Sequence, residues 1–103
     1  MLQATIDLPE SLATLPAAER NRLIQAGMYE AIRARMQEIA KELEIANAEI
    51  QKFEQRYGVS FARFENDLLP TLDAHQAHED YNDWFFWQSV HQEKQALLQS
   101  LRP

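Results

Sequence analysis

The chain of 103 residues contains no cysteine, which excludes disulfide bonds, thiolate nucleophiles and zinc sites built on cysteine. Glycine occurs only twice, so the glycine-rich loops that hold nucleotide phosphates are excluded as well. No apolar run approaches the roughly 18 residues that cross a bilayer, and no basic segment followed by an apolar run marks a signal peptide. We therefore expect a cytoplasmic protein that has no membrane partner.

Candidates for metal or catalytic chemistry are sparse. His75, His78, Glu79 and Asp83 lie close together in the sequence, but their spacing matches no known ligand motif. Acid pairs are frequent, yet general acid–base catalysis needs a concave site that shifts their pKa values, and a small helical protein rarely provides one. We expect no catalytic residue, no metal site and no cofactor, and hence a protein that is not an enzyme.

What the chain does contain favours helix, because Ala, Gln, Glu and Leu are abundant. Residues 17–57 follow Pro16, include no proline, and are predicted to form one long helix, which the single Gly27 could divide. Along it, apolar residues recur with the a/d heptad pattern of a coiled coil. They are Tyr29, Met36, Leu43, Ile50 and Tyr57 at one position, and Ile32, Ile39, Ala46 and Phe53 at the other.

Two arrangements can bury this heptad seam. A second copy can pair with it, in parallel or antiparallel sense, or a later helix of the same chain can fold back on it. The flanking charges are mostly positive early in the helix and mostly negative late, which fits antiparallel pairing of two copies.

Residues 1–16 form an N-terminal strand or arm in this interpretation. Leu2, Ala4, Ile6 and Leu8 alternate with polar residues, as in a half-buried strand, and the pattern ends at Pro9. A lone strand needs a partner strand, and no second one is evident, so another copy of the chain is expected to supply it.

A paired strand followed by helices is also the plan of ribbon–helix–helix proteins, whose strands enter the major groove of DNA. The residues that would contact DNA are Gln3, Thr5, Arg20 and Arg22, since Gln and Thr can reach bases and Arg can hold phosphates. Asp7 and the net charge of −6 oppose this function.

Residues 58–103 are predicted to form a compact C-terminal helical hairpin. Gly58 suits the end of the long helix, and Ser60 is a candidate N-cap for a short helix. Asp80 is a candidate N-cap for a last helix that covers residues 81–101. This last helix would pack back against the second half of the long helix.

Five of the ten aromatic residues of the chain fall between Tyr81 and Trp87. Consecutive residues on a helix are about 100° apart, so these rings cannot all face one core. Exposed aromatic clusters usually mark an interface, and Trp and Tyr are enriched at binding hot spots. From Glu65 to Asp83 there are six acids and no Lys or Arg, so a partner here is expected to be basic.

Two segments carry a resemblance to a known group of proteins, namely YGVSFARFE at 57–65 and HEDYNDWFFW at 78–87. The chain resembles small bacterial and archaeal antitoxin-like helical proteins with a Tyr-Gly-hydrophobic-Ser-x-x-x-Phe segment and an Asp-Tyr-x-Asp-Trp segment. The resemblance covers about residues 37–101. It implies an N-terminal part that dimerises and binds an operator, and an acidic C-terminal part that wraps a basic toxin. The N-terminal segment departs from an ordinary ribbon–helix–helix because its first helix is too short.

Together these observations predict a mainly α protein with a short N-terminal strand, one long heptad-patterned helix and the C-terminal helical hairpin, assembled as a dimer or tetramer. The predicted function is an antitoxin-like, non-enzymatic module that dimerises and neutralises a small basic toxin-like protein. The alternatives are a self-associating coiled-coil structural or scaffolding protein and a small transcriptional regulator.

The predicted oligomer interface is Ile6, Met36, Ile39, Leu43, Ile50 and Phe53. The predicted partner-binding residues are Asp80, Tyr81, Asp83, Trp84, Phe86 and Trp87.

Overall fold

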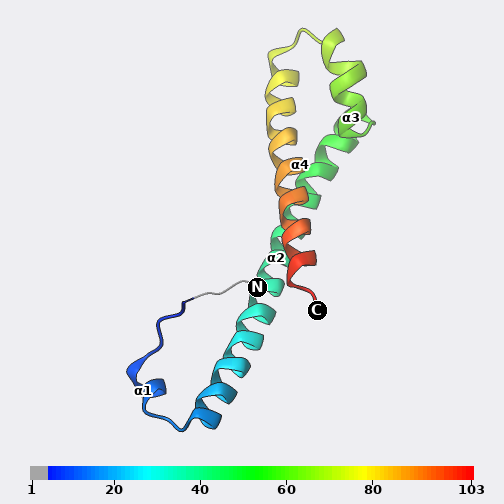
Figure 1. Cartoon of the computed structure of the whole chain (residues 1–103). Helices are drawn as coiled ribbons and strands as arrows, with labels where there is room; N and C mark the ends of the chain where they lie inside the picture. Colours follow the sequence, from blue (N-terminus) through cyan, green and yellow to red (C-terminus); the bar gives the residue numbers. More distant parts are fainter. Residues whose placement is uncertain (1–4) are drawn as a thin grey trace. The chain divides into compact units, whose positions relative to one another are not determined.

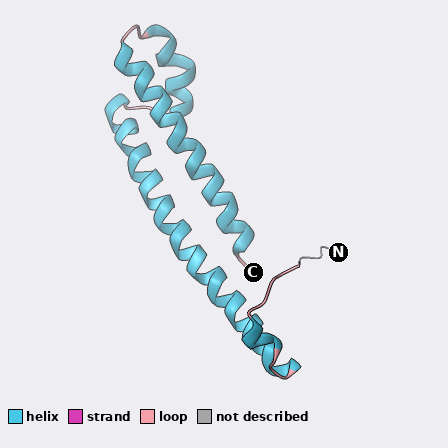
Figure 2. Ribbon diagram, turned by 90° about the vertical axis from the view of Figure 1, so that its left-hand side faces the viewer, coloured by secondary structure: helices cyan, strands magenta, loops and turns pink. Residues whose placement is uncertain are grey.

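The computed structural model describes residues 5–103, and they are mainly helical, with no strand among them (Figures 1 and 2). The elements are α1 (Glu10–Ala13), α2 (Ala17–Tyr57), α3 (Phe61–Arg63), the π-helical turn η1 (Phe64–Leu68), the 3-10 turn η2 (Leu69–Thr71) and α4 (His75–Leu101). The chain divides into two compact units, an N-terminal unit that ends at Ala34 and a C-terminal unit, Arg35–Pro103.

The prediction of one long, unbroken helix is confirmed by α2, so the predicted alternative of a break at Gly27 is wrong. Its first turn is closed by the N–H of Arg20, which donates to the carbonyl of Pro16 at 2.9 Å. The helix ends where Gly58 takes a φ of 71°, a left-handed conformation that residues with a Cβ rarely adopt.

The two glycines of the chain make a matched pair for a stability test. Gly58→Ala is expected to lower the free energy of unfolding by about 1 kcal/mol, because a Cβ strains the left-handed backbone. Gly27→Ala is expected to raise it by about 0.5–1 kcal/mol, because alanine favours helix interiors and a Cβ at Gly27 meets no atom within 4 Å. Urea titration followed by circular dichroism measures both, and a stabilising Gly58→Ala would contradict the assignment of this C-cap.

The predicted N-terminal strand is not seen in the described residues. Residues 5–9 take no regular structure and α1 is a single helical turn, while Leu2, Gln3 and Ala4 lie outside the described residues. Ile6 is 62 % exposed, so within this chain it is not part of a buried interface. The physical reason is that strand hydrogen bonds need a second strand, and residues 5–103 supply none.

In the C-terminal unit, α3 begins as predicted at Ser60, whose Oγ accepts a hydrogen bond from the N–H of Arg63 at 3.3 Å. The last helix, however, begins at His75 and not at residue 81. Asp80 is therefore an interior residue of α4, and its assignment as an N-cap is wrong. The physical reason is that tertiary partners, described below, satisfy its carboxylate.

Within the C-terminal unit, helix α4 runs antiparallel beside the later part of α2, as both ribbon views show (Figures 1 and 2). Along this part the heptad seam is covered: Ile39, Ala46, Ile50 and Phe53 are buried. The second of the two predicted arrangements, a helix of the same chain folding back on the seam, therefore holds here.

This covering takes three of the six predicted oligomer-interface residues away from the surface. Ile39, Ile50 and Phe53 are buried within the chain itself, and Met36 and Leu43 are half-buried. A heptad pattern shows that a helix face is buried but does not show whether another copy or the same chain covers it. In the N-terminal unit, by contrast, Tyr29 and Ile32 of the same pattern remain 71 % and 37 % exposed.

Candidate protein-binding surfaces

The most buried charge of the C-terminal unit is Asp80, which is 3 % exposed. Its Oδ2 accepts hydrogen bonds from Arg56 Nη1 at 2.7 Å and from the Tyr57 hydroxyl at 2.6 Å, and its Oδ1 accepts one from Gln76 Nε2 at 2.9 Å. Three donors that favour the charged form outweigh burial, so the pKa of Asp80 lies below its usual value. This network fastens the start of α4 to the end of α2.

The same network raises the pKa of Tyr57 to about 12, first because burial disfavours the phenolate and second because its hydroxyl donates to Asp80. The pKa of Tyr81 is raised too, chiefly because its hydroxyl donates to Glu65 Oε2 at 2.6 Å. Both hydroxyls are therefore held as donors to carboxylates, which is a structural arrangement.

Trp84 lies at the centre of the core and is fully buried. Four rings surround it, with centroids between 5.2 and 6.1 Å away. They belong to Phe53, Tyr57, Phe61 and Phe64. Asp80 and Trp84 therefore face their own chain, and their assignment to a partner-binding surface is corrected.

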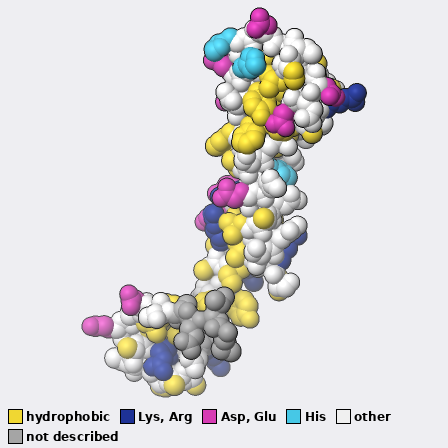
Figure 3. All heavy atoms as spheres, turned by 45° about the horizontal axis from the view of Figure 1, so that its top comes forward, with side chains coloured by type: hydrophobic (Ala, Val, Ile, Leu, Met, Phe, Trp, Pro, Cys, Tyr) yellow, Lys and Arg dark blue, Asp and Glu magenta, His cyan; other side chains and the backbone are white. Residues whose placement is uncertain are grey.

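The other four predicted partner-binding residues divide by exposure. Tyr81 and Trp87 are half-buried and pack against the core, whereas Asp83 is exposed and Phe86 is 55 % exposed. Phe85, which the sequence prediction left out, is 52 % exposed. Figure 3 shows hydrophobic side chains reaching the surface of this unit beside Asp, Glu and His side chains.

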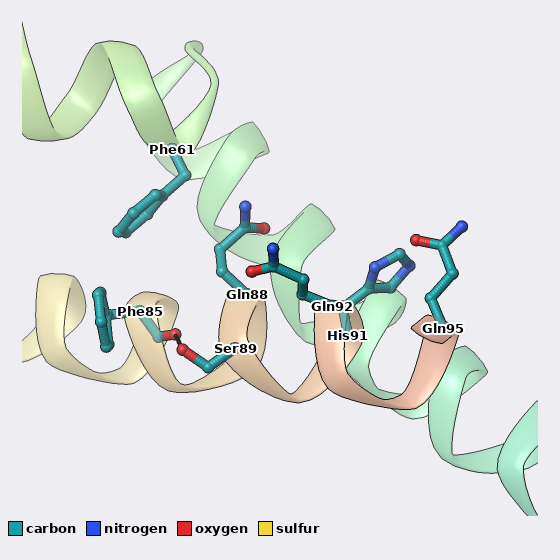
Figure 4. A pocket seen from close by; sticks show the side chains of 7 residues that line it. All are labelled: Phe61, Phe85, Gln88, Ser89, His91, Gln92 and Gln95. Carbon is teal, nitrogen blue, oxygen red and sulfur yellow. Dashed lines mark hydrogen bonds between the residues drawn. The ribbon is translucent and has the colours of Figure 1, made fainter. Parts of the chain in front are cut away.

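Phe85 lines one of two grooves along α4, with the ring of Phe61 at a centroid distance of 6.2 Å (Figure 4). Amide side chains of α4 point into it, and Ser89 Oγ donates to the carbonyl of Phe85 at 2.9 Å. We call it the glutamine groove; its lining is Phe61, Phe85, Gln88, Ser89, His91, Gln92 and Gln95. It presents amide, hydroxyl and imidazole groups and no Asp, Glu, Lys or Arg.

Phe86 lines the other groove, between α2 and α4. We call it the apolar groove; its lining is Glu42, Ile45, Phe86, Trp87, Val90 and Lys94. Ile45 is 56 % exposed, although it lies outside the heptad positions and was therefore missed by the sequence prediction. At one end Lys94 Nζ lies 3.2 Å from Glu42 Oε2, an ion contact whose geometry is not that of a directed hydrogen bond.

The N-terminal unit carries an exposed apolar surface of its own on α2. We call it the apolar stripe, and it consists of Met28, Tyr29 and Ile32 with Gln25 beside them. Met28 is 51 % exposed, in addition to the exposure of Tyr29 and Ile32 given above. Side chains three or four residues apart share a helix face, so this stripe continues the heptad pattern into a stretch that the unit leaves open.

Three of the four predicted DNA contacts lie among the described residues of the N-terminal unit. Thr5 and Arg22 are exposed and Arg20 is half-buried, while Gln3 lies outside the described residues.

Among residues 5–103 no three His, Asp or Glu side chains come close enough to hold a metal ion, and His75 Nε2 lies 2.9 Å from Glu79 Oε1. No helix within that range has the length and apolar character needed to span a membrane.

Comparison with family models, with curated proteins and with solved structures found no match to this chain.

Proposed function

We propose that this chain is a non-enzymatic, antitoxin-like binding protein that pairs with a second copy through its N-terminal unit and neutralises a basic partner through its C-terminal unit. The observation that carries the proposal is Phe86, which leaves more than half of its surface in water on a strongly acidic unit. An exposed aromatic ring on a helix held by a well-packed core is typical of a binding anchor.

The charge of the C-terminal unit supports a basic partner. Residues 65–83 carry six acids and no Lys or Arg. Among the salt bridges of the described residues, Arg56 reaches Asp80 and Arg63 lies 3.6 Å from Asp67, whereas Asp73 and Asp83 have no Lys or Arg partner. Unpaired surface acids attract a positively charged protein and raise its rate of association.

The apolar stripe supports pairing with a second copy. Tyr29 and Ile32 belong to the heptad pattern, and the part of the seam that follows them is already buried by α4. A two-fold pair buries the same patch of both copies at once, so a short stripe gains twice the buried surface. Strand pairing between the N-terminal arms of the two copies would extend this interface and is part of the same proposal.

The test of the main proposal is affinity purification of the tagged chain from its own host, with mass spectrometry of the bound proteins. We expect one small basic protein in equal amount, and a complex that weakens as salt concentration rises. Asp83→Lys is expected to weaken that complex at least about tenfold, whereas Glu93→Lys, an equal change of charge further along α4, is expected to have a smaller effect. Recovery of the bait alone, as a defined oligomer, would contradict the proposal.

That last outcome would favour the second candidate, a self-associating structural or scaffolding protein. The observation behind this candidate is the apolar stripe, which can serve self-assembly without any other partner.

Self-association is tested directly on the apolar stripe. The double variant Tyr29→Glu, Ile32→Glu is expected to convert a dimer into a monomer, because buried carboxylates without partners are strongly unfavourable. Ala34→Glu, on an exposed position of the same helix that is neither three nor four residues from any member of the stripe, is the matched control and should leave the dimer intact. Light scattering coupled to size-exclusion chromatography measures the mass; a double variant that stays dimeric would place the interface elsewhere.

A further inference from the structure

We propose that the apolar groove of the C-terminal unit receives one amphipathic helix of the basic partner, with apolar side chains between Ile45 and Phe86 and Lys or Arg along its edge. This inference rests on the proposed function and specifies which of the two grooves acts and what it binds. The occupant is a helix of a second, basic protein.

The lining of the groove is mainly apolar. Ile45 from α2 and Phe86 from α4 are both more than half exposed, and Trp87 and Val90 lie between the two helices beside them. Groups this apolar, contributed by two antiparallel helices, form the kind of groove into which a third helix packs. Along α4 the lining from Phe86 to Lys94 extends roughly 12 Å, which is about two turns of a bound helix.

The charges at the edge of the groove favour a basic partner. Asp83 lies three residues before Phe86 and four before Trp87, so it shares their side of α4, and it has no Lys or Arg partner among the described salt bridges. Glu79 lies one further turn back on the same side. At the other end Lys94 is already engaged by Glu42 at 3.2 Å. The free charge at the edge of the groove is therefore negative, which selects a partner with basic residues flanking its apolar face.

The walls of the groove do not suit an extended peptide. Strand addition needs an exposed sheet edge with free backbone N–H and C=O groups. Both walls of the groove are helices, α2 and α4, whose interior backbone groups are bonded within each helix. Side-chain packing of a helix is the mode that remains.

The glutamine groove on the other side of α4 serves as the comparison. Its lining contains no Asp, Glu, Lys or Arg, and its aromatic floor is partly covered because Phe61 also packs on Tyr81 at a centroid distance of 5.6 Å. Phe85 and Phe86 are adjacent residues of the same type with exposures of 52 % and 55 %. Truncating one or the other therefore changes a different groove by nearly the same amount of exposed surface.

The probe is a fluorescent synthetic peptide of about 14 residues with Leu on one helix face and Lys on the other, titrated into the full chain at low salt. We expect it to bind, and a version with Glu in place of Lys to fail. Phe86→Ala and Ile45→Ala should each weaken binding about tenfold, while Phe85→Ala leaves it unchanged. Circular dichroism melting confirms that each variant folds.

Equal loss from Phe85→Ala and Phe86→Ala, no loss from Phe86→Ala, or equal binding of the Glu peptide would each overturn the inference. The same variants are then used against the basic protein that purifies with the chain. If that protein binds Phe86→Ala as well as the original chain, the groove assignment fails and the proposed function stands. If the Lys peptide binds as expected but no basic protein is recovered from the host, the groove stands and the proposed function fails.

Discussion

Replacing Trp84 with alanine is expected to lower the free energy of unfolding by about 4 kcal/mol, the largest effect of any single change in this chain. The side chain is fully buried, and the nearest of the four rings packed around it is Phe64, at a centroid distance of 5.2 Å. Removing it takes away the shared contact of α2, the turn that follows it, and α4, and leaves a cavity that these elements cannot close. Loss of this size is a large fraction of the stability of a small domain.

Urea titration followed by circular dichroism measures the effect, since the fluorescence of Trp84 is lost in the variant. Phe86→Ala, a truncation of a large aromatic side chain two residues away, is the matched control and should cost less than about 1 kcal/mol. Trp84→Phe should lower the free energy of unfolding less than Trp84→Ala does, because the phenylalanine ring leaves a smaller cavity. A second reason concerns the indole N–H. The indole Nε1 of Trp84 is buried without a hydrogen-bond partner, and phenylalanine removes that unfavourable donor. Equal loss from Trp84→Ala and Phe86→Ala would disprove this assignment of the core.

The second large effect is expected at Asp80, where alanine should cost about 2–3 kcal/mol. The variant leaves the hydroxyl of Tyr57 without its acceptor in a partly buried place. This decrease in the free energy of unfolding is at the lower end of the range for breaking a buried ion pair. The reason is that the side chain of Arg56 is 53 % exposed and can be solvated once Asp80 is removed. Asp83→Ala, an exposed acid on the same helix, should change stability by less than about 0.5 kcal/mol.

The Asp80 network also predicts a pH dependence at both extremes. The pKa of Asp80 in the folded chain lies below its usual value of 3.8, so its stabilising contribution is complete above that pH. The contribution is lost as the pH falls through the lower, folded-state pKa. For Tyr57 the folded pKa is raised from 10.0 to about 12, so its contribution is complete below pH 10.0 and is lost as the pH rises toward 12.

Unfolding measured at a series of pH values tests both signs. Asp80→Asn should flatten the acid limb, and Tyr57→Phe should flatten the alkaline limb, relative to the original chain. The absorbance of ionised tyrosine should show Tyr57 titrating near pH 12 instead of 10.0, and Tyr81 also above the usual pKa of tyrosine. Identical pH profiles for the three chains would mean that the network does not contribute to folding.

The aromatic run of α4 serves two different purposes. Trp84 belongs to the core, whereas Phe85 and Phe86 lie on opposite grooves and are free to contact other molecules. Sequence reasoning predicted such a division, because neighbouring helix positions point in different directions. It could not say which rings were inside, since that depends on where α2 and the short helical turns lie around α4.

The candidate surfaces were predictable in part. Asp83 and Phe86 were chosen from the sequence and are exposed, and the acidic character of the segment follows from composition alone. Ile45 was missed because the heptad pattern directs attention to the seam, and Ile45 lies off it. The only sequence signal that could have found it is that an isoleucine at a non-seam position needs a second explanation.

The sequence by itself determined the local structure of this protein. Low glycine and proline content, Gly58 with its positive φ, Ser60 as an N-cap and the heptad period together define where α2 ends and which of its faces is apolar. These features depend on neighbours within a few residues, so they can be read from the chain directly.

Only the tertiary structure decided which elements meet. The same heptad pattern is buried by α4 from Ile39 onward and left exposed at Tyr29, and Asp80, suited by type to cap a helix, instead binds Arg56 and Tyr57. The heptad pattern indicates that a helix face is buried, and the type of a side chain indicates which hydrogen bonds it can form. The identity of the covering helix, and of the bonding partner, comes from contacts between residues far apart in the chain.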